Sequence, residues 1–282
     1  MSVQANWPIG VFDSGVGGLT VLNALRQRLP QENLLYLGDT ARVPYGTKSS
    51  LSVTRYAEQA VACLLRNNVK MIVVACNTAS AVAIEPLRAL YPNLPIVGVV
   101  EPGAEASCDA SRTGHIGVIA TESTVNNAAY QAAILKRNPD ASIVAQACSL
   151  FVALAEEGWH DGELVDQIVT QCLAPLKQDQ HARIDTLVLG CTHFPALQGS
   201  IGRVMGDKVT LVDSADTTAR YVAKQLQEHQ LANLMKCSGE VNFMVTDGPE
   251  RFVRVANHFF SEAIDLARVQ VVDIQHLEPA EG

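Results

Sequence analysis

The chain has no concentrated charge and no long apolar run. Charged residues make up only 18% of its 282 residues, and the net charge of −8 is spread along the sequence without a cluster of Lys or Arg. A surface that tracks phosphates is therefore not expected. No apolar stretch approaches the ~20 residues that a membrane-spanning helix requires, and the N-terminus lacks the basic and apolar regions of a signal peptide. These absences predict a cytoplasmic protein with no nucleic-acid or membrane partner.

Cysteine pairs at metal-site spacing are absent as well. The seven cysteines are an odd number, lie far apart in the chain and include no C-x-x-C pair. A disulfide framework and a structural zinc site are both disfavoured by this pattern. We expect free thiols and no bound metal, and burial as a small apolar side chain is the simplest interpretation of any single cysteine.

Signals for nucleotides and for pyridoxal phosphate are incomplete. The loop "DSGVGG" at 13–18 lacks the third glycine of G-x-G-x-x-G, and the chain has no G-K-[ST]. Glycines that allow a tight strand-to-helix turn and close packing are the structural interpretation of this loop. Lys48 lies in the "YGTKSS" loop, away from any glycine-rich phosphate cup. We therefore expect no cofactor.

What the chain does contain is a regular alternation of short apolar runs and longer amphipathic segments. Helix-like periodicity covers 53–65 and the segment from Val21 to Leu29, which Pro30 ends. Strands that are apolar on both faces and separated by helices are typical of a parallel sheet covered on each side. The sequence predicts an α/β fold. Apolar runs of strand length next to turn residues occur at 9–12, 34–37, 71–75, 96–100, 116–120, 186–190 and 208–212.

A weak internal sequence repeat indicates two similar α/β domains. "IGVFDSGVGGLTV" (9–21) and "IGVIATESTVNNA" (116–128) each read as a strand, a polar turn and a helix, and each is followed by a strand that ends in cysteine. Prolines and glycines near 93–103 indicate a boundary between the two domains. We predict a first domain of residues 1–98 plus 212–282 and a second of 99–211, with the active site in the cleft between them.

Polar residues follow the predicted strands at their carboxyl ends, where open parallel sheets bind ligands. A carboxylate such as Asp13 beside a helix N-terminus suits a ligand that carries both an ammonium and a carboxylate group. Helix capping by the threonines and a structural role for His193 are the simpler interpretations. The residues in question are Asp13, Ser14, Asn77, Thr78, Thr121, Thr192 and His193.

Two cysteines stand at such strand ends, Cys76 in "VVACNTAS" and Cys191 in "VLGCTHFP". A helix N-terminus lowers the pKa of a thiol, so we expect both thiolates to form near neutrality. One reactive cysteine with a histidine suits a hydrolase. Two comparable thiols on opposite sides of a cleft suit racemisation, in which one base removes a proton and the other returns it to the opposite face. The neighbouring hydroxyls and amides would stabilise the charge that develops on a substrate carboxylate.

A larger set of motifs resembles one family. In order they are "FDSGVGGLTV", "GDTARVPYG", "ACNTAS", "GVVEPG", "GVIATESTV" and "LGCTHFP", spread over roughly 9–220. The set resembles bacterial glutamate racemase, of the cofactor-independent aspartate/glutamate racemase group. The resemblance implies two α/β domains related by a pseudo-twofold axis. It also implies interconversion of L- and D-glutamate, which supplies D-glutamate for peptidoglycan synthesis.

The resemblance also implies residue roles. Cys76 looks like the base for the D-enantiomer and Cys191 the base for the L-enantiomer, with Asp13 and His193 assisting the two thiols. A glutamate of the second domain assists as well; "LFVALAEEG" offers Glu156 and Glu157, of which we prefer Glu156, although the chain reads "CSLFVAL" where the family has "CPLFVPL". The implied substrate contacts are Asp13, Ser14, Tyr45, Gly46, Asn77, Thr78, Thr121, Thr192 and His193.

Three alternatives stay open at this point. The same chemistry would racemise aspartate or another acidic amino acid. A cysteine-dependent hydrolase or isomerase would form a covalent intermediate, and an amino-acid-binding module would bind without turnover. The sequence does not decide between a monomer and a homodimer, nor whether a cell-wall precursor activates the protein.

Overall fold

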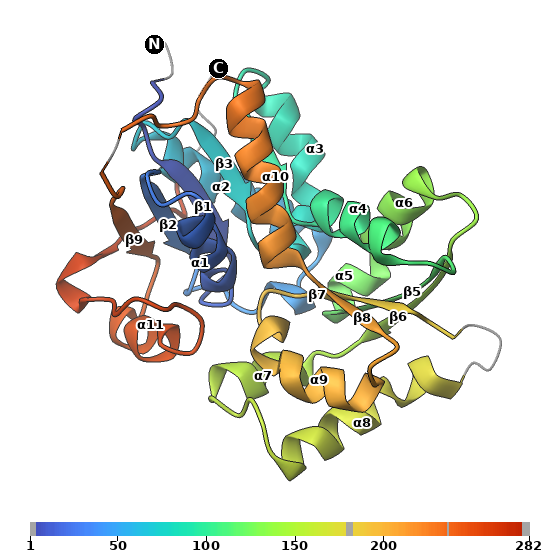
Figure 1. The fold of residues 1–282 in the computed structure, drawn as a ribbon. Coiled ribbons are helices and arrows are strands. Elements are labelled where there is room, and N and C mark those ends of the chain that lie inside the picture. The colour runs from blue at the N-terminus through green and yellow to red at the C-terminus, as the bar shows by residue number, and fades with distance from the viewer. Residues whose placement is uncertain (1–3, 179–182, 236, 278–282) are drawn as a thin grey trace.

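The computed structural model describes residues 4–178, 183–235 and 237–277, and within these ranges the strands form two sheets (Figure 1). The larger sheet has the order β10-β9-β2-β1-β3-β4 and the smaller sheet has the order β6-β5-β7-β8. Every neighbouring pair is parallel. The prediction of an α/β protein with two parallel-sheet domains is confirmed.

The larger sheet is covered on both faces because its central strands are apolar on both sides. Val11 packs beneath α1 and α10, whereas the next residue, Phe12, points to the opposite face and packs with α2 and α3. This is why the strands read as unbroken apolar runs in the sequence. The elements are β1 (Ile9–Asp13), β2 (Leu34–Gly38), β3 (Met71–Val74), β4 (Ile96–Gly98), β9 (Val241–Val245) and β10 (Val269–Val271), with α1 (Leu19–Arg28), α2 (Ser50–Leu65), α3 (Asn77–Leu90), α10 (Ser214–Glu228) and α11 (Pro249–Ala256).

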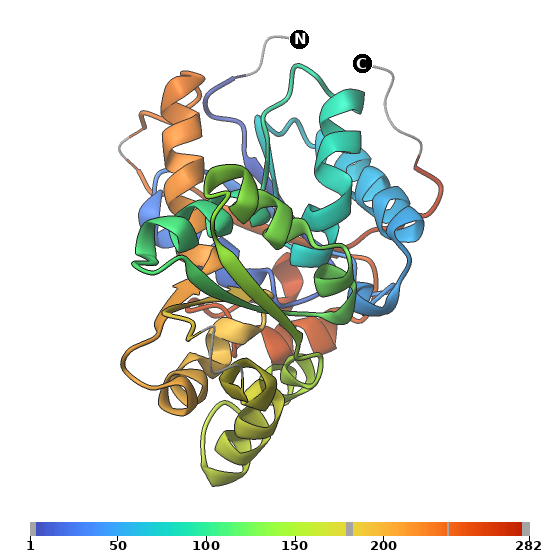
Figure 2. The ribbon, with the colours of Figure 1, turned by 90° about the vertical axis from the view of Figure 1, so that its right-hand side faces the viewer.

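The smaller sheet repeats this arrangement. Ile119 packs with α7, α8 and α9 on one face, and Val118 packs with α4 and α6 on the other. Figure 2, turned from the first view, shows α4 and α6 on the side of this sheet opposite α8. The elements are β5 (His115–Ala120), β6 (Ser142–Ala147), β7 (Thr186–Gly190) and β8 (Thr210–Asp213), with α4 (Val100–Ala110), α5 (Glu122–Asn126), α6 (Ala129–Arg137), α7 (Leu150–Glu156), α8 (Glu163–Gln178) and α9 (Gln198–Met205).

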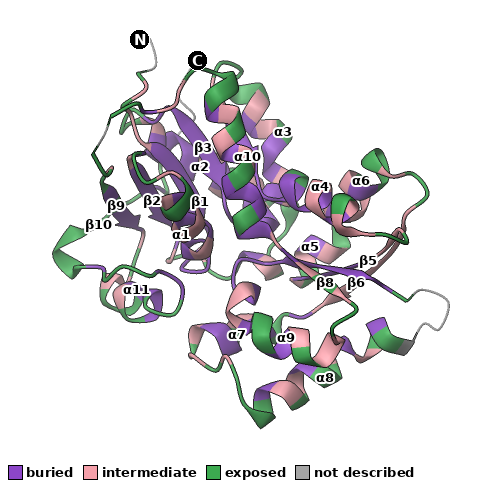
Figure 3. Ribbon diagram, viewed as in Figure 1, coloured by how far each residue is buried: buried purple, intermediate pink, exposed green. Residues whose placement is uncertain are grey.

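A strand overlaps each apolar run expected to be one, and α1 and α2 overlap the two segments with helix periodicity. Three further strands, β6, β9 and β10, were not expected. All six residues of β6 are only partly buried, Asn242 is exposed in the middle of β9, and two of the three residues of β10 are exposed. Figure 3 shows the burial of each residue along the ribbon. Strands with exposed or half-buried positions lack the continuous apolar run that marked the central strands.

The strands of the smaller sheet lie within 115–213, and those of the larger sheet lie within 9–98 and 241–271. The chain passes between them at Asp213, the last residue of β8, which caps α10 by accepting a hydrogen bond from Ala215 N at 2.7 Å. The domain boundaries at 98–99 and 211–212 stay a prediction. No helix within the described ranges is long and apolar enough to cross a membrane.

Candidate active site

The two strand-end cysteines occupy equivalent places in the two sheets. Cys76 follows β3 and stands at the start of α3, and Cys191 directly follows β7. Each is buried, with 5% of its surface exposed. Because both lie at the carboxyl ends of central parallel strands, each thiol stands where its own sheet directs loops and helix N-termini.

Glycines let the turns of the two sheets meet around these thiols. A side chain at Gly17, in the β1–α1 turn, would collide with the His193 ring and would come within 2.5 Å of Thr192 Oγ1. A side chain at Gly46 would come within 2.8 Å of Thr121 Cβ. Only a residue without Cβ permits so close an approach. The structure therefore brings the polar residues of the two sheets, predicted from separate motifs, into one site.

The Cys76 thiol faces an environment that opposes ionisation. Its Sγ donates a hydrogen bond to Ser14 Oγ at 3.6 Å. Burial, with the nearby Asp13, raises the pKa of Cys76 to about 12 and outweighs the hydrogen bonds with the backbone N–H of Ala79 and with Ser14, which act in the opposite direction. The expectation that this thiolate forms near neutrality is wrong, because burial and Asp13 raise the pKa by more than the helix N-terminus lowers it.

Asp13 ends β1 and is fully buried. Its Oδ2 accepts a hydrogen bond from Gly15 N at 2.9 Å, while its Oδ1 is buried without a partner. Burial raises the pKa of Asp13, and the charge of His193 acts in the opposite direction. A buried carboxylate oxygen without a donor is costly, so the geometry suits a ligand that brings a cation or a donor to it.

The Cys191 thiol belongs to a chain of charged partners. Its Sγ lies 3.8 Å from His193 Nδ1, His193 Nε2 lies 3.1 Å from Glu156 Oε1, and Arg251 donates to Glu156 Oε2 at 2.8 Å. Burial alone would lower the pKa of His193, but its hydrogen bonds to Cys191 and Glu156 raise the pKa to about 10. Burial likewise opposes ionisation of Glu156, but the bonds from His193 and Arg251 lower its pKa to about 2.

With a pKa of about 10, His193 is a histidinium at neutral pH and lies beside Cys191 Sγ, whereas the neighbour of Cys76 is the buried carboxyl group of Asp13. The two cysteines share a position in their sheets but not an electrostatic environment. Asp13 lies near Cys76, whereas the His193 ring lies beside Cys191, so each thiol has a neighbour of a different kind.

Hydroxyl and amide groups next to Cys76 in the chain contact residues that follow β5. Thr78 Oγ1 lies 3.0 Å from Thr121 Oγ1 and 3.3 Å from Thr124 Oγ1. Asn77 Oδ1 accepts a hydrogen bond from Tyr130 at 2.7 Å, whereas its Nδ2 is buried without a partner. Thr192 is buried as well. This cluster offers several donors to a ligand carboxylate.

Tyr45 and Gly46 reach the site from the loop after β2. The Tyr45 hydroxyl donates to the Asp39 carboxylate, which also accepts from Arg42 Nε at 2.6 Å and Thr246 Oγ1 at 2.9 Å. Asp39 is fully buried by these partners. It anchors the loop that holds Gly46 against Thr121, a structural role that a turn residue can fill.

Sequence reasoning did not single out Thr124, Tyr130 or Arg251. Thr124 lies within the quoted "GVIATESTV" motif and Tyr130 only five residues after that motif ends, so the segment itself was a signal. No sequence signal marked Arg251, since 95 residues separate it from Glu156. Of the two glutamates offered by α7 and its end, the structure places Glu156 against His193, whereas Glu157 is exposed.

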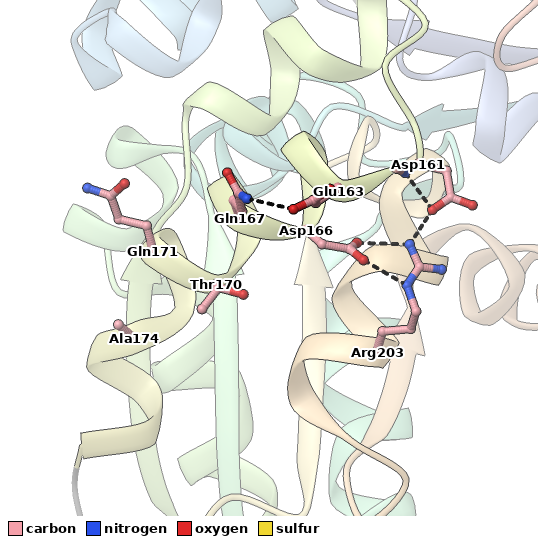
Figure 4. Close-up of a pocket in the computed structure, with 9 residues that line it drawn as sticks. Asp161, Glu163, Asp166, Gln167, Thr170, Gln171, Ala174 and Arg203 are labelled. Atoms are coloured by element: carbon pink, nitrogen blue, oxygen red, sulfur yellow. Dashed lines mark hydrogen bonds and ion pairs between the residues drawn. The ribbon is translucent and has the colours of Figure 1, made fainter.

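A surface hollow of about 870 Å³ lies elsewhere, on the outer side of α8 (Figure 4). Arg203 lines it and donates to Asp166 at 2.8 Å and to Asp161. None of the predicted site residues lines it. Within the described residues, no three His, Cys, Asp or Glu side chains are grouped to hold a metal ion.

A family model described as Asp/Glu/Hydantoin racemase matches residues 19–222. The chain belongs to this family. It is 49% identical to the glutamate racemase of Geobacter metallireducens, over 89% of this chain and 92% of that protein. It is 46% identical to the glutamate racemase of Neisseria meningitidis serogroup A, over 92% of this chain and 94% of that protein.

Solved structures agree with this assignment. The glutamate racemase of Francisella tularensis, in complex with D-glutamate, matches with a TM-score of 0.89 at 35% identity, covering 97% of this chain and 100% of that one. The Thermus thermophilus enzyme in complex with beta-chloro-D-alanine matches with a TM-score of 0.87 at 42% identity, with the same coverage. The resemblance stated from the motifs is confirmed, and the chain is an amino-acid racemase by family.

Proposed function

We propose that the protein interconverts L- and D-glutamate by proton transfer between Cys76 and Cys191, without a cofactor. The observation that carries this proposal is the pair of buried thiols at the ends of β3 and β7, with Asp13 near Cys76 and His193 beside Cys191. A hydrolase needs one activated cysteine, whereas inversion at carbon needs a base on each face. The second cysteine therefore favours racemisation over a cysteine-dependent hydrolase and over an amino-acid-binding module.

In the proposed reaction the Cys191 thiolate, paired with the His193 imidazolium, takes the α-proton of L-glutamate. The electron pair of the broken C–H bond stays on the substrate and is delocalised into its α-carboxylate. The Cys76 thiol then gives its proton to the opposite face of the carbon, which forms D-glutamate and leaves a thiolate on Cys76. The reverse reaction begins from that thiolate, so atoms and charge balance in both directions.

The neighbouring groups match the charges of the substrate at each stage. The free Oδ1 of Asp13 suits the ammonium group. Asn77 Nδ2 and the hydroxyls of Thr78, Thr121 and Thr192 suit the α-carboxylate, whose negative charge increases as the proton leaves. Such preorganised donors act more strongly in a site closed to water. We assign Ser14, Tyr45 and Gly46 to the rest of the substrate, with Glu156 supporting His193.

The choice of glutamate over aspartate rests on the relatives. Proteins named glutamate racemase are 42–49% identical to this chain over most of its length, whereas the aspartate racemase of Picrophilus torridus is only 14% identical and supports the fold alone. We further propose that the D-glutamate serves peptidoglycan synthesis in the cytoplasm, a reducing compartment that suits the seven free thiols.

The test is circular dichroism of L-glutamate incubated in D2O with the purified protein and no added cofactor, with Cys76→Ser and Cys191→Ser in parallel. We expect the signal to decay to zero, deuterium to enter at the α-carbon, and both variants to lose turnover in both directions. A covalent adduct on one cysteine, or full activity in either variant, would contradict the two-base mechanism. Aspartate in place of glutamate serves as the substrate control.

A further inference from the structure

A buried hydrogen bond links the two sheets behind the proposed site. Tyr130 Oη, from α6, lies 2.7 Å from Oδ1 of Asn77, the first residue of α3 and the neighbour of Cys76. Tyr130 is 1% exposed and Asn77 is 3% exposed. Because neither group is open to water, each depends on the other for this bond.

The bond fixes which way the Asn77 amide points. Burial, with the charges of Cys191 and Asp213, raises the pKa of Tyr130, so the hydroxyl keeps its proton and donates a hydrogen bond to the amide oxygen. The Nδ2 group then points away from Tyr130 and is buried without a partner. An unpaired buried donor costs about 1–3 kcal/mol, which is recovered when a ligand acceptor meets it.

The Tyr130 ring has little freedom to move. A side chain at Gly103, on α4, would come within 3.1 Å of Tyr130 Cε1 and 3.2 Å of its Oη, and one at Gly190 would come within 3.0 Å of Cε2. Gly190 directly precedes Cys191. The ring therefore packs against the turn that carries one thiol, while its hydroxyl bonds the residue beside the other.

We propose that Tyr130 is a positioning residue of the racemase, which holds the Asn77 carboxamide with Nδ2 toward the substrate carboxylate. The inference rests on the proposed function. Without the hydroxyl, the amide is free to turn over, and its oxygen would then face the carboxylate and repel it. Tyr130 itself does not touch the substrate in this proposal; it acts through Asn77.

The test is a double-mutant cycle of Tyr130→Phe with Asn77→Ala, read as kcat and KM for both enantiomers. Tyr130→Phe keeps the packed ring and removes only the oxygen. We expect kcat/KM to fall about tenfold, the effect of one misdirected hydrogen bond, with KM raised for L- and D-glutamate. In the Asn77→Ala background, we expect Tyr130→Phe to cause no further loss, because the group that it positions is gone.

A second variant guards against misfolding of the first. Gly103→Ala keeps the Tyr130 hydroxyl but adds a methyl group against the ring and the hydroxyl, which displaces them by a few tenths of an ångström. Alanine also suits a helix better than glycine, so the variant should fold. We expect a loss of the same kind, again absent in the Asn77→Ala background. Tyr221→Phe, on α10 away from the site, is the matched hydroxyl deletion and should leave kcat and KM unchanged.

The outcomes separate this inference from the proposed function. Equal losses in the Asn77 and Asn77→Ala backgrounds, or wild-type kinetics in Tyr130→Phe, would overturn the positioning role and leave the racemase intact. A wild type that fails to racemise glutamate would overturn the proposed function and this inference with it. The inference is supported if Tyr130→Phe lowers kcat/KM only when Asn77 is present and Tyr221→Phe leaves kcat/KM unchanged.

Discussion

His193 Nε2 and Glu156 Oε1 lie 3.1 Å apart although 37 residues separate them in the sequence. The contact joins the end of α7 to the turn after β7, and it raises the pKa of the histidine while lowering that of the glutamate. A histidinium is thereby maintained beside Cys191. The charge state of the site thus depends on a carboxylate that does not itself contact the thiol.

Replacing this carboxylate should weaken the reaction most at alkaline pH. In Glu156→Gln the pKa of His193 falls, because the imidazolium loses an anionic partner, and the ring becomes neutral at a lower pH. We expect kcat/KM to fall about tenfold or more, with a larger loss at pH 9 than at pH 7. Glu157→Gln, the exposed neighbour, is the control. Equal pH profiles for the two variants would count against the role of Glu156.

The two thiols should differ in reactivity in the substrate-free protein. Both are 5% exposed, so access is matched. With a pKa of about 12, Cys76 is ionised in roughly one molecule in ten thousand at pH 8. We expect iodoacetamide to modify Cys191 before Cys76, as followed by peptide mass spectrometry, with the exposed Cys237 as an internal standard for reagent activity. Faster modification of Cys76 would contradict the assigned environments.

The close approach at Gly17 should be intolerant of a single methyl group. In Gly17→Ala the new Cβ collides with the His193 ring and Thr192, so the turns that carry the two sets of partners must separate. We expect racemisation to fall at least ~100-fold, since misplacement of reacting groups by about an ångström has that effect. Gly202→Ala in α9 meets nothing closer than 3.7 Å and is the control, with activity retained. Comparable activity in both would refute the close approach.

The His193–Glu156 pair should shape stability against pH. The pKa of Glu156 is about 2 in the folded protein and 4.5 ordinarily, so its stabilising effect is complete above pH 4.5 and is lost as pH falls toward 2. The pKa of His193 is about 10 against 6.5, so its effect is complete below pH 6.5 and is lost as pH rises toward 10. The pair therefore contributes most between pH 4.5 and 6.5.

Melting temperatures of the wild type and Glu156→Gln across this range provide the measurement. We expect the difference between them to be largest between pH 4.5 and 6.5 and to shrink on both sides. Asp185, whose pKa is also about 2, remains in the variant, so acid unfolding itself persists. A difference that does not vary with pH would exclude the pair as its source.

The sequence predicted the central strands and the thiols, because both depend on local patterns. Buried parallel strands are continuous apolar runs, and Cys76 and Cys191 directly follow such runs. The edge strand β6 lacks this pattern, since its residues are only partly buried. The raised pKa of Cys76 could not be predicted either, because it depends on burial and on Asp13 from a neighbouring strand.

Contacts between segments that lie far apart in the chain could not be predicted from the sequence either. Arg251 reaches Glu156 across 95 residues, and no motif marks it. Tyr130 lies just beyond a quoted motif, but its proposed role depends on a hydrogen bond to Asn77, which lies on α3 next to the larger sheet. Family resemblance supplied Glu156 and Tyr45, which local chemistry alone did not single out. The residues that support the site, rather than those that react, were the ones that required the fold.

The crossing at Asp213 has a consequence for synthesis of the protein on the ribosome. β2 pairs with β9, as in the register of Leu34 with Val241, so the larger sheet stays incomplete until the C-terminal segment emerges. All four strands of the smaller sheet are synthesised before β9. One edge of β2 therefore stays unpaired from the synthesis of β2 until β9 emerges. An open strand edge invites pairing with other chains. Nascent chains truncated before residue 241 should therefore depend more on chaperones than the finished protein does.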